Sequence, residues 1–356
     1  VCGAAGSRLE RDLSDERAWK FLFAIPRMVL APTAALGEDG PSGAEQIVAR
    51  CQLVLQGSFA EAWGAFACDR PKSAQANTVE DGVELAVYID ECVRDKNLSR
   101  AVRRVVSTGI APATLDTADL INGRCPQHGA VDLRDRASYL ENADLGRAKP
   151  SDPKRAEQLV KKWQAVCSSA QRRSAPGGEG WRYEHLDIWL KAHDTGAYVM
   201  QAIADHRVPP DVRTFLSADR MLAFVKPDPD GVAPPSIAFG IRPIGIPSAF
   251  RRTAHRPLAT EATARWSERL LEMGQVGCGL RAGPEVPPRL LQAMLEFDPS
   301  CAIDSEDVKN AFNEVDREAV ADVLKREDPE LYDYFMAYYQ TGCLQLFRLF
   351  SGELLR

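Results

Sequence analysis

The sequence has no long apolar run and no disulfide-like cysteine pattern. Its best apolar segment, FLFAIPRMVLAP, is interrupted by Pro26 and Arg27, whereas a membrane-spanning helix needs about 18 or more continuous apolar residues. The nine cysteines are odd in number, scattered, and never spaced as CxxC. We therefore expect no membrane contact and no secreted disulfide framework, and the cysteines indicate reduced thiols in an intracellular protein.

Three common ligand-binding motifs are also missing. The segment Cys125-Pro-Gln-His128 offers two zinc ligands without a second pair nearby, and a structural zinc site needs four. The glycine-rich segment SAPGGEGWRYEHL has no GKS or GKT after it, so it is not a Walker phosphate loop. An EF-hand fails near Asp228 because Gly231 falls at the fourth place of the loop instead of the sixth, and DREAVADVLKRE has no glycine there.

The overall composition is that of a soluble globular protein. The chain has 356 residues, 45% of them hydrophobic and 26% charged, so it can bury a sizeable core in two or three domains. Its formal net charge is −6. That value excludes a uniformly basic nucleic-acid-binding coat, but it allows a local basic groove.

The first 150 residues predict helices with no recognisable chemistry. A helical stripe of Trp19, Leu22, Phe23, Pro26 and Val29 is most simply core. A polar connector follows at residues 141–155, and the next helix is expected to begin at Ser151 or Asp152 with Pro153 in its first turn. The chain starts with Val1 and ends at Arg356 without a structural stop signal, so we expect a fragment.

The most informative block follows that helix. RMLAFVKP and IRPIGIP predict two short strands joined by a hairpin that is rich in proline and glycine. No acidic residue occurs between Gly231 and Thr260, and this basic segment contains Arg242, Arg251, Arg252 and Arg256. The arginines are either solvated side chains on a strand pair or phosphate clamps, for which the planar guanidinium group is well suited. The segment alone leaves both interpretations open.

A third strand is expected over Ser300–Asp307, with a helix beginning near Lys309. Alternation along this strand would put Cys301, Ile303, Ser305 and Asp307 on one face. The tail DPELYDYFMAYYQTGCLQLFRLF predicts a helix rich in tyrosine and phenylalanine, followed by another strand.

Five segments, in this order, resemble the reverse transcriptases of non-LTR (LINE-type) retrotransposons, with a secondary likeness to group II intron enzymes. They are SAPGGEGWRYEHL, LAFVKPDPDG, IRPIGIPSAFRR, QVGCGLRAG and DVKNAFNEVDR, and they span roughly residues 174–317. The resemblance implies an α+β chain. Residues 1–150 form a helical region of unknown role, and residues 151–356 form the fingers and an incomplete palm of a right-hand polymerase.

The resemblance also implies roles for individual residues. Asp307 matches the first palm carboxylate, which binds two Mg²⁺ ions, with Mn²⁺ as an alternative metal. The backbone carbonyl of Val308 completes the coordination of one ion. Phe312 matches the aromatic residue that excludes a 2′-hydroxyl, and Lys226 and Arg242 match finger residues that grip the incoming triphosphate.

Further expectations come from the same resemblance. Template-contacting or pocket-forming positions of the family correspond to Arg251, Arg252, Gln275 and Arg281. The resemblance implies an RNA template, a DNA primer and deoxynucleoside triphosphates as partners, with DNA synthesis primed from a nick in chromosomal DNA inside the nucleus. That reaction is RNA-directed DNA synthesis by nucleotidyl transfer to a primer 3′-hydroxyl.

The sequence departs from the family pattern in two ways. Asp304 and Glu306 stand where the family has mostly apolar residues, and the later palm motifs with the remaining carboxylates do not occur before Arg356. We therefore expect that this chain alone does not polymerise. The alternative is a non-catalytic nucleic-acid-binding or scaffold remnant of a retroelement that kept the basic segment and has no need of Asp307.

Overall fold

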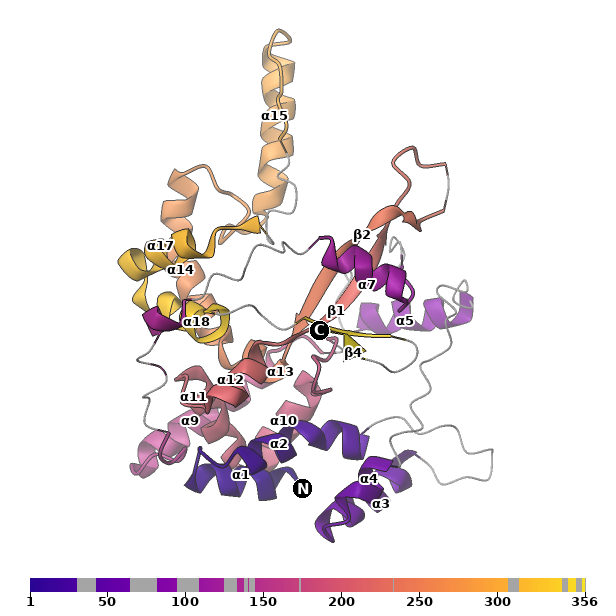
Figure 1. Ribbon diagram of the computed structural model, residues 1–356. Helices are drawn as coiled ribbons and strands as arrows, with labels where there is room; N and C mark the ends of the chain where they lie inside the picture. Colours follow the sequence, from indigo (N-terminus) through magenta and orange to yellow (C-terminus); the bar gives the residue numbers. More distant parts are fainter. Residues whose placement is uncertain are drawn as a thin grey trace.

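The computed structural model is an α+β fold in which helices surround one small sheet (Figure 1). Within the described part of the chain, no helix is both long and apolar enough to cross a membrane. The structure describes residues 1–30, 43–64, 82–94, 109–124, 133–137, 140, 145–172, 174–232, 234–306, 314–340, 345–349 and 354–355.

The N-terminal region is helical, as predicted. Asp15 caps α2 (Glu16–Ile25) by accepting a hydrogen bond from the amide of Ala18 at 3.0 Å, and the predicted apolar stripe from Trp19 to Val29 is buried. The chain continues from α2 directly into a short π-helix, η1 (Pro26–Leu30). The other elements here are α1 (Cys2–Arg11), α3 (Gly43–Leu55), α4 (Phe59–Gly64), α5 (Gly82–Arg94), α7 (Leu115–Asn122) and η2 (Arg134–Ala137).

The next group of helices begins where the sequence predicts. Asp152 caps α9 (Pro153–Ser168) by accepting from the amide of Lys154 at 3.0 Å, and Pro153 occupies the first turn. Proline fits there because the first-turn amides have no partner within the helix. Three short helices follow: α10 (Tyr183–Ala192), α11 (Thr195–Ala204) and α12 (Pro210–Ser217).

The predicted hairpin is formed by β1 (Asp219–Lys226) and β2 (Ser236–Pro247), which pair antiparallel. Alternate residues of β1, beginning with Met221 and Ala223, are buried under α7. β3 (Gln345–Arg348) pairs parallel with the start of β1, and β4 (Leu354–Leu355) pairs with β3, which gives the strand order β2-β1-β3-β4.

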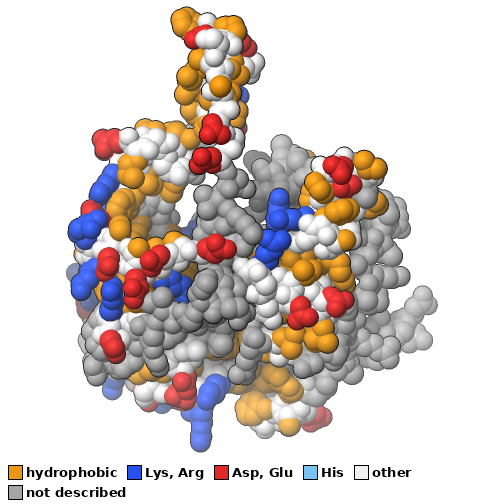
Figure 2. Space-filling view, turned by 45° about the horizontal axis from the view of Figure 1, so that its top comes forward, with side chains coloured by type: hydrophobic (Ala, Val, Ile, Leu, Met, Phe, Trp, Pro, Cys, Tyr) orange, Lys and Arg blue, Asp and Glu red, His pale blue; other side chains and the backbone are white. Residues whose placement is uncertain are grey.

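The C-terminal helices pack on one another and on α12, with one exception. α13 (Ala249–Ala254), α14 (Arg256–Glu272), α17 (Arg317–Glu327) and α18 (Pro329–Tyr339) belong to the body of the molecule, whereas α15 (Val286–Phe297), preceded by η3 (Gly283–Glu285), projects from it (Figure 1). α15 buries no residue, and its hydrophobic side chains cover the projecting column in Figure 2. Phe297 at its end is 92% exposed.

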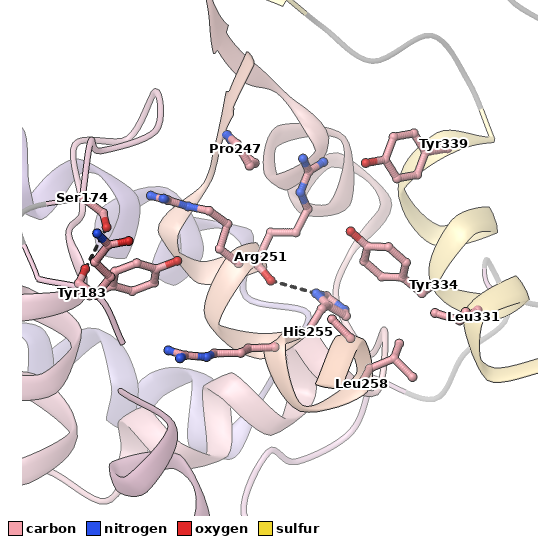
Figure 3. Close-up of a pocket in the computed structure, with 13 residues that line it drawn as sticks. Ser174, Tyr183, Pro247, Arg251, His255, Leu258, Leu331, Tyr334 and Tyr339 are labelled. Carbon is pink, nitrogen blue, oxygen red and sulfur yellow. Dashed lines mark hydrogen bonds between the residues drawn. The ribbon is translucent and has the colours of Figure 1, made fainter. Parts of the chain in front are cut away.

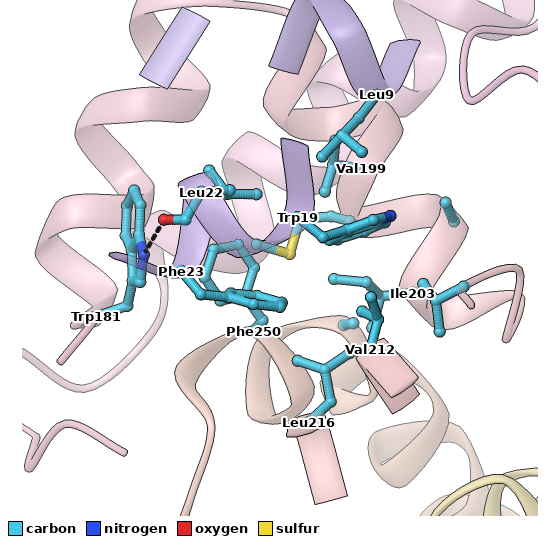
Figure 4. Packing of buried hydrophobic residues seen from close by; sticks show 14 of the residues in the cluster. Leu9, Trp19, Leu22, Phe23, Trp181, Val199, Ile203, Val212, Leu216 and Phe250 are labelled. Atoms are coloured by element: carbon cyan, nitrogen blue, oxygen red, sulfur yellow. Dashed lines mark hydrogen bonds between the residues drawn. The ribbon is translucent and has the colours of Figure 1, made fainter. Parts of the chain in front are cut away.

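One large core joins elements from both sides of residue 150. Trp19 and Phe23 of α2 lie with Trp181 and Phe250 in the same cluster of buried residues (Figure 4). Trp181 donates a hydrogen bond from its Nε1 to the carbonyl of Leu22 at 3.0 Å. The glycine-rich segment that precedes α10 is therefore attached to the N-terminal helices.

The expected strand over Ser300–Asp307 is not formed in its described part. Residues 301–306 have no regular secondary structure, and all of them are exposed. A strand is stable when it pairs with a neighbour and buries one face, and a segment that carries Asp304 and Glu306 gains little by doing so. The expectation for Ser300–Asp307 was therefore wrong, and the helix start near Lys309 lies outside the described residues.

Candidate nucleic-acid interface

The hairpin presents Arg242 on the side of the sheet away from α7. Arg242 lies opposite Phe224 in the β1–β2 register, so the two side chains share a face, and the alternate residues Ala223 and Val225 point into the core under α7. Arg242 is exposed. Among the described residues, no ion pair joins it to a carboxylate.

Lys226 lies at the end of β1, next to a glycine of β2. The backbone of Gly240 has a φ of +94°, and a Cβ built there would lie 3.8 Å from Cδ of Lys226 and 3.4 Å from Nη2 of Arg124. Arg124 follows α7 and is far from the hairpin in sequence, so the sequence patterns do not point to it. The fold thus brings Lys226 and Arg124 to the same glycine of the strand that carries Arg242.

The other arginines of the basic segment line a pocket of about 570 Å³ between α13, α14 and α18. We name it the arginine–tyrosine pocket after its main lining residues. In Figure 3, Tyr334 and Tyr339 face Arg251 from α18, and Tyr183 lies on the opposite side. No Asp or Glu occurs among the lining residues that the structure describes. Their arginines and tyrosines are Arg251, Arg252, Arg256, Tyr183, Tyr334 and Tyr339.

Arg251 is held firmly inside the protein. It is 4% exposed and donates to Oδ1 of Asp219 at 2.9 Å and to the carbonyl of Ser217 at 3.1 Å. Its guanidinium carbon also lies 5.9 Å from the ring centroid of Tyr339. Burial raises the pKa of Asp219, although Arg251 opposes that shift. These contacts give Arg251 a structural role at the wall of the pocket.

Arg252 and Arg256 bind main-chain carbonyls in preference to carboxylates. Arg252 donates to the carbonyl of Ala175 at 2.8 Å and lies 4.9 Å from the ring centroid of Tyr183, and Arg256 donates to the carbonyl of Ser169 at 3.2 Å. A carbonyl orients a guanidinium group without neutralising it. The interpretation as solvated side chains is therefore wrong for Arg251, which is buried against Asp219, and the phosphate-clamp interpretation of the segment stays a prediction.

The tyrosines were missed by sequence reasoning. The tail helix was predicted as rich in tyrosine, and the structure confirms it as α18, but no local pattern indicates that Tyr334 and Tyr339 would face the arginines. Asp328 joins α14 to α18 by accepting hydrogen bonds from Arg265 at 2.9 Å and from Nε1 of Trp266 at 2.8 Å. This long-range junction brings the tyrosines to the pocket.

A buried histidine pair lies against this pocket. The rings of His206 and His255 stack with centroids 5.4 Å apart, and Nδ1 of His255 lies 2.9 Å from the carbonyl of Arg251. Burial lowers the pKa of His255 to about 3, and the neighbouring His206 adds to that shift. Burial lowers the pKa of His206 to about 4, and the neighbouring Arg213 adds to it. Both rings are therefore neutral at pH 7.

This pair makes stability depend on pH. Unfolded histidine titrates near pH 6.5, so between about pH 6.5 and 4 the unfolded chain binds more protons than the folded chain and stability falls as the pH is lowered. At pH 5 each of the two buried histidines should lower the free energy of unfolding by about 2 kcal/mol. Denaturant unfolding at pH 7 and pH 5 should show the loss for the natural chain and roughly half of it for His206→Asn.

The choice of Asn and of a control follows from the backbone. His206 has a φ of +57°, a left-handed conformation that Asn tolerates. The matched control is His193→Asn, because His193 is exposed. The histidine assignment fails if His206→Asn and His193→Asn lose the same stability between the two pH values.

The remaining predicted site residues lie elsewhere. Gln275 and Arg281 are exposed in the loop between α14 and η3, where Oε1 of Gln275 accepts from the amide of Gly277 at 2.8 Å, and neither residue lines the arginine–tyrosine pocket. Asp307, Val308 and Phe312 lie outside the described residues. Arg251 and Arg252 therefore line one pocket to which Gln275 and Arg281 do not contribute.

The described part of the chain contains no ready-made metal centre. No group of three or more His, Cys, Asp or Glu side chains within it is close enough to hold a metal ion. Asp304 and Glu306 are exposed and belong to no such group. Asp307 and the segment Cys125–His128 lie outside the described residues.

Comparison with known proteins gives no match. No family model fits the chain, and no curated protein or solved structure is significantly similar to it. A functional proposal must therefore rest on the residues themselves.

Proposed function

We propose that the chain is a fragment of an RNA-directed DNA polymerase of a LINE-type retrotransposon, comprising the fingers and the first part of the palm. The observation that carries the proposal is the β1–β2 hairpin, which forms in the predicted segment and has Arg242 on an uncovered face and Lys226 at its end. The ordered resemblance of the five segments supports it as well. Triphosphate binding needs cations of this kind, held on rigid strands.

In this proposal each residue has its own role in nucleotidyl transfer. Lys226 and Arg242 hold the incoming triphosphate, Phe312 lies against the sugar, and Asp307 with the carbonyl of Val308 would hold Mg²⁺. The metal ions supply charge stabilisation at the attacking and leaving oxygens when bound. A two-ion site needs further carboxylates, so activity is expected only in a protein that contains this chain together with them.

A second candidate function is nucleic-acid binding without catalysis. It is favoured by the arginine–tyrosine pocket, because aromatic faces beside guanidinium groups resemble the surfaces on which single-stranded bases stack. This function needs neither Asp307 nor a metal ion. The two candidates predict the same RNA binding but differ in primer extension.

The test of the proposal is primer extension on an RNA template with deoxynucleoside triphosphates and Mg²⁺. A longer protein that includes this chain should extend the primer if the polymerase proposal holds. RNA binding without any extension would reject that proposal and support the second candidate.

The hairpin cations provide a separate prediction for the chain itself. RNA affinity should fall steeply with salt, and Lys226→Ala or Arg242→Ala should each reduce the slope of log K against log salt by about one. The matched control is Arg289→Ala on α15, whose side chain is 81% exposed. An affinity that does not change with salt would contradict the phosphate-clamp interpretation.

A further inference from the structure

A second cavity, of about 890 Å³, lies beside the glycine-rich segment before α10. We call it the glycine-loop pocket, because Gly177, Gly178 and Gly180 form part of its wall. It shares no lining residue with the arginine–tyrosine pocket. The remaining walls come from η1, the segment before α7, α10, β1, β3 and β4.

Positive charge is concentrated around this cavity. Among the described residues that line it are four arginines, each from a different segment, together with His185, and no Asp or Glu. In a chain with a net charge of −6, such separation of charge is informative. The four arginines are Arg27 in η1, Arg182 before α10, Arg220 in β1 and Arg348 in β3.

Arg220 is partly buried and lies near two of the other arginines. Its Nε is buried and has no hydrogen-bond partner within the described part of the chain, and its pKa is lowered by burial and further by the nearby Arg182 and Arg27. Glu179 raises the pKa of Arg220. This carboxylate is 3% exposed, however, and already accepts hydrogen bonds from the hydroxyl of Ser248 at 2.9 Å and from the amide of Ala249 at 2.7 Å. A half-buried cation beside other cations is unfavourable unless an anion joins it.

The rest of the wall is partly apolar and includes a side chain to main chain hydrogen bond. Arg27 donates to the carbonyl of Gly178 at 2.6 Å, which fixes the glycine-rich segment against η1. Leu222 and Phe347 are among the apolar residues that lie between the arginines. An anion with apolar parts, such as a phosphate joined to a sugar and a base, fits these walls better than a bare ion.

We propose that the glycine-loop pocket binds phosphodiester groups of a single-stranded nucleic acid. Arg182 and Arg220 contact the phosphates, and the apolar wall accommodates a sugar or base. The volume lies within the usual range for ligand pockets, about 300–1,000 Å³. The inference shares its class of ligand with the proposed function, but it does not require the chain to polymerise.

The test measures binding of a labelled single-stranded RNA of about 20 nucleotides, long enough to cover more than one binding patch, by fluorescence anisotropy at several salt concentrations. Arg182→Gln and Arg220→Gln should each weaken binding about tenfold at low salt, and each should reduce the salt slope by about one. Arg155→Gln is the matched control, because Arg155 is an exposed arginine of α9 outside the pocket. It should change the affinity less than about twofold.

Two further measurements keep the test decisive. Circular dichroism melting checks that Arg220→Gln folds, and Arg182→Gln alone carries the test if it does not, because Arg182 is exposed. Equal affinities and slopes for Arg182→Gln and Arg155→Gln would overturn the proposal. It would also be overturned if the pocket variants lost binding of inorganic pyrophosphate while keeping full RNA affinity, since the pocket would then hold a free phosphate compound.

The same measurements distinguish this inference from the proposed polymerase function. If a longer protein extends no primer but Arg182→Gln still weakens RNA binding, the polymerase proposal fails and the pocket assignment holds. If extension occurs and Arg182→Gln binds RNA like Arg155→Gln, the polymerase proposal holds and the pocket assignment fails.

Discussion

Alanine at Asp307 should abolish RNA-templated primer extension in a protein that contains this chain and the remaining palm carboxylates. A carboxylate that holds catalytic Mg²⁺ takes part in several kcal/mol of transition-state charge stabilisation. Its loss should therefore reduce the extension rate by about a thousandfold or more. RNA affinity should stay within about twofold, because the basic residues that meet phosphate are untouched.

The sequence offers a matched control three residues earlier. Asp304 is an exposed acidic residue in the same segment, so Asp304→Ala removes an equal charge. It should leave extension within a few-fold of the natural rate. Equal extension by the two variants would remove Asp307 from the proposed catalytic site, and a loss of RNA binding in Asp307→Ala would indicate a structural role.

Replacing Trp181 with alanine should give the largest loss of stability. Trp181 is 1% exposed, and its ring centroid lies 5.2 Å from that of Phe250 and 5.9 Å from that of Trp189. Deleting a buried aromatic side chain costs about 3–5 kcal/mol, and the lost hydrogen bond to Leu22 adds about 1 kcal/mol. Guanidinium denaturation should show a correspondingly lower unfolding free energy.

Trp63→Ala is the control for this variant. Trp63 is 45% exposed, so the same substitution should cost about 1 kcal/mol or less, in line with its smaller buried apolar area. Similar losses for the two variants would mean that Trp181 does not anchor the glycine-rich segment to α2. Figure 4 shows the hydrogen bond between Trp181 and Leu22, which joins two segments that are far apart in the chain.

Local elements could be predicted where one segment contains the whole signal. The stripe from Trp19 to Val29 repeats at helical spacing, and Asp152 with Pro153 is a complete start signal for α9. The strand over Ser300–Asp307 failed because alternation alone does not supply a pairing partner or a buried face. Strand formation depends on neighbours that the segment itself does not encode.

The candidate site could likewise be predicted from the sequence only in part. The lack of acidic residues between Gly231 and Thr260, and the strand pair that presents Arg242, can be read from the sequence. The buried contact between Arg251 and Asp219 cannot be read from the sequence, because the two residues are 32 positions apart. A residue type indicates which contacts are chemically suitable, but not which partner the fold supplies.

The sequence by itself determined the helical N-terminal region, the hairpin and the basic segment, because periodicity, caps and charge spacing act within a few turns of the chain. Only the tertiary structure decided which arginines support the fold and which surround a cavity. Arg27, Arg182, Arg220 and Arg348 meet at one pocket from four separate segments. Packing of the shared core brings them together, and that packing depends on contacts between residues hundreds of positions apart.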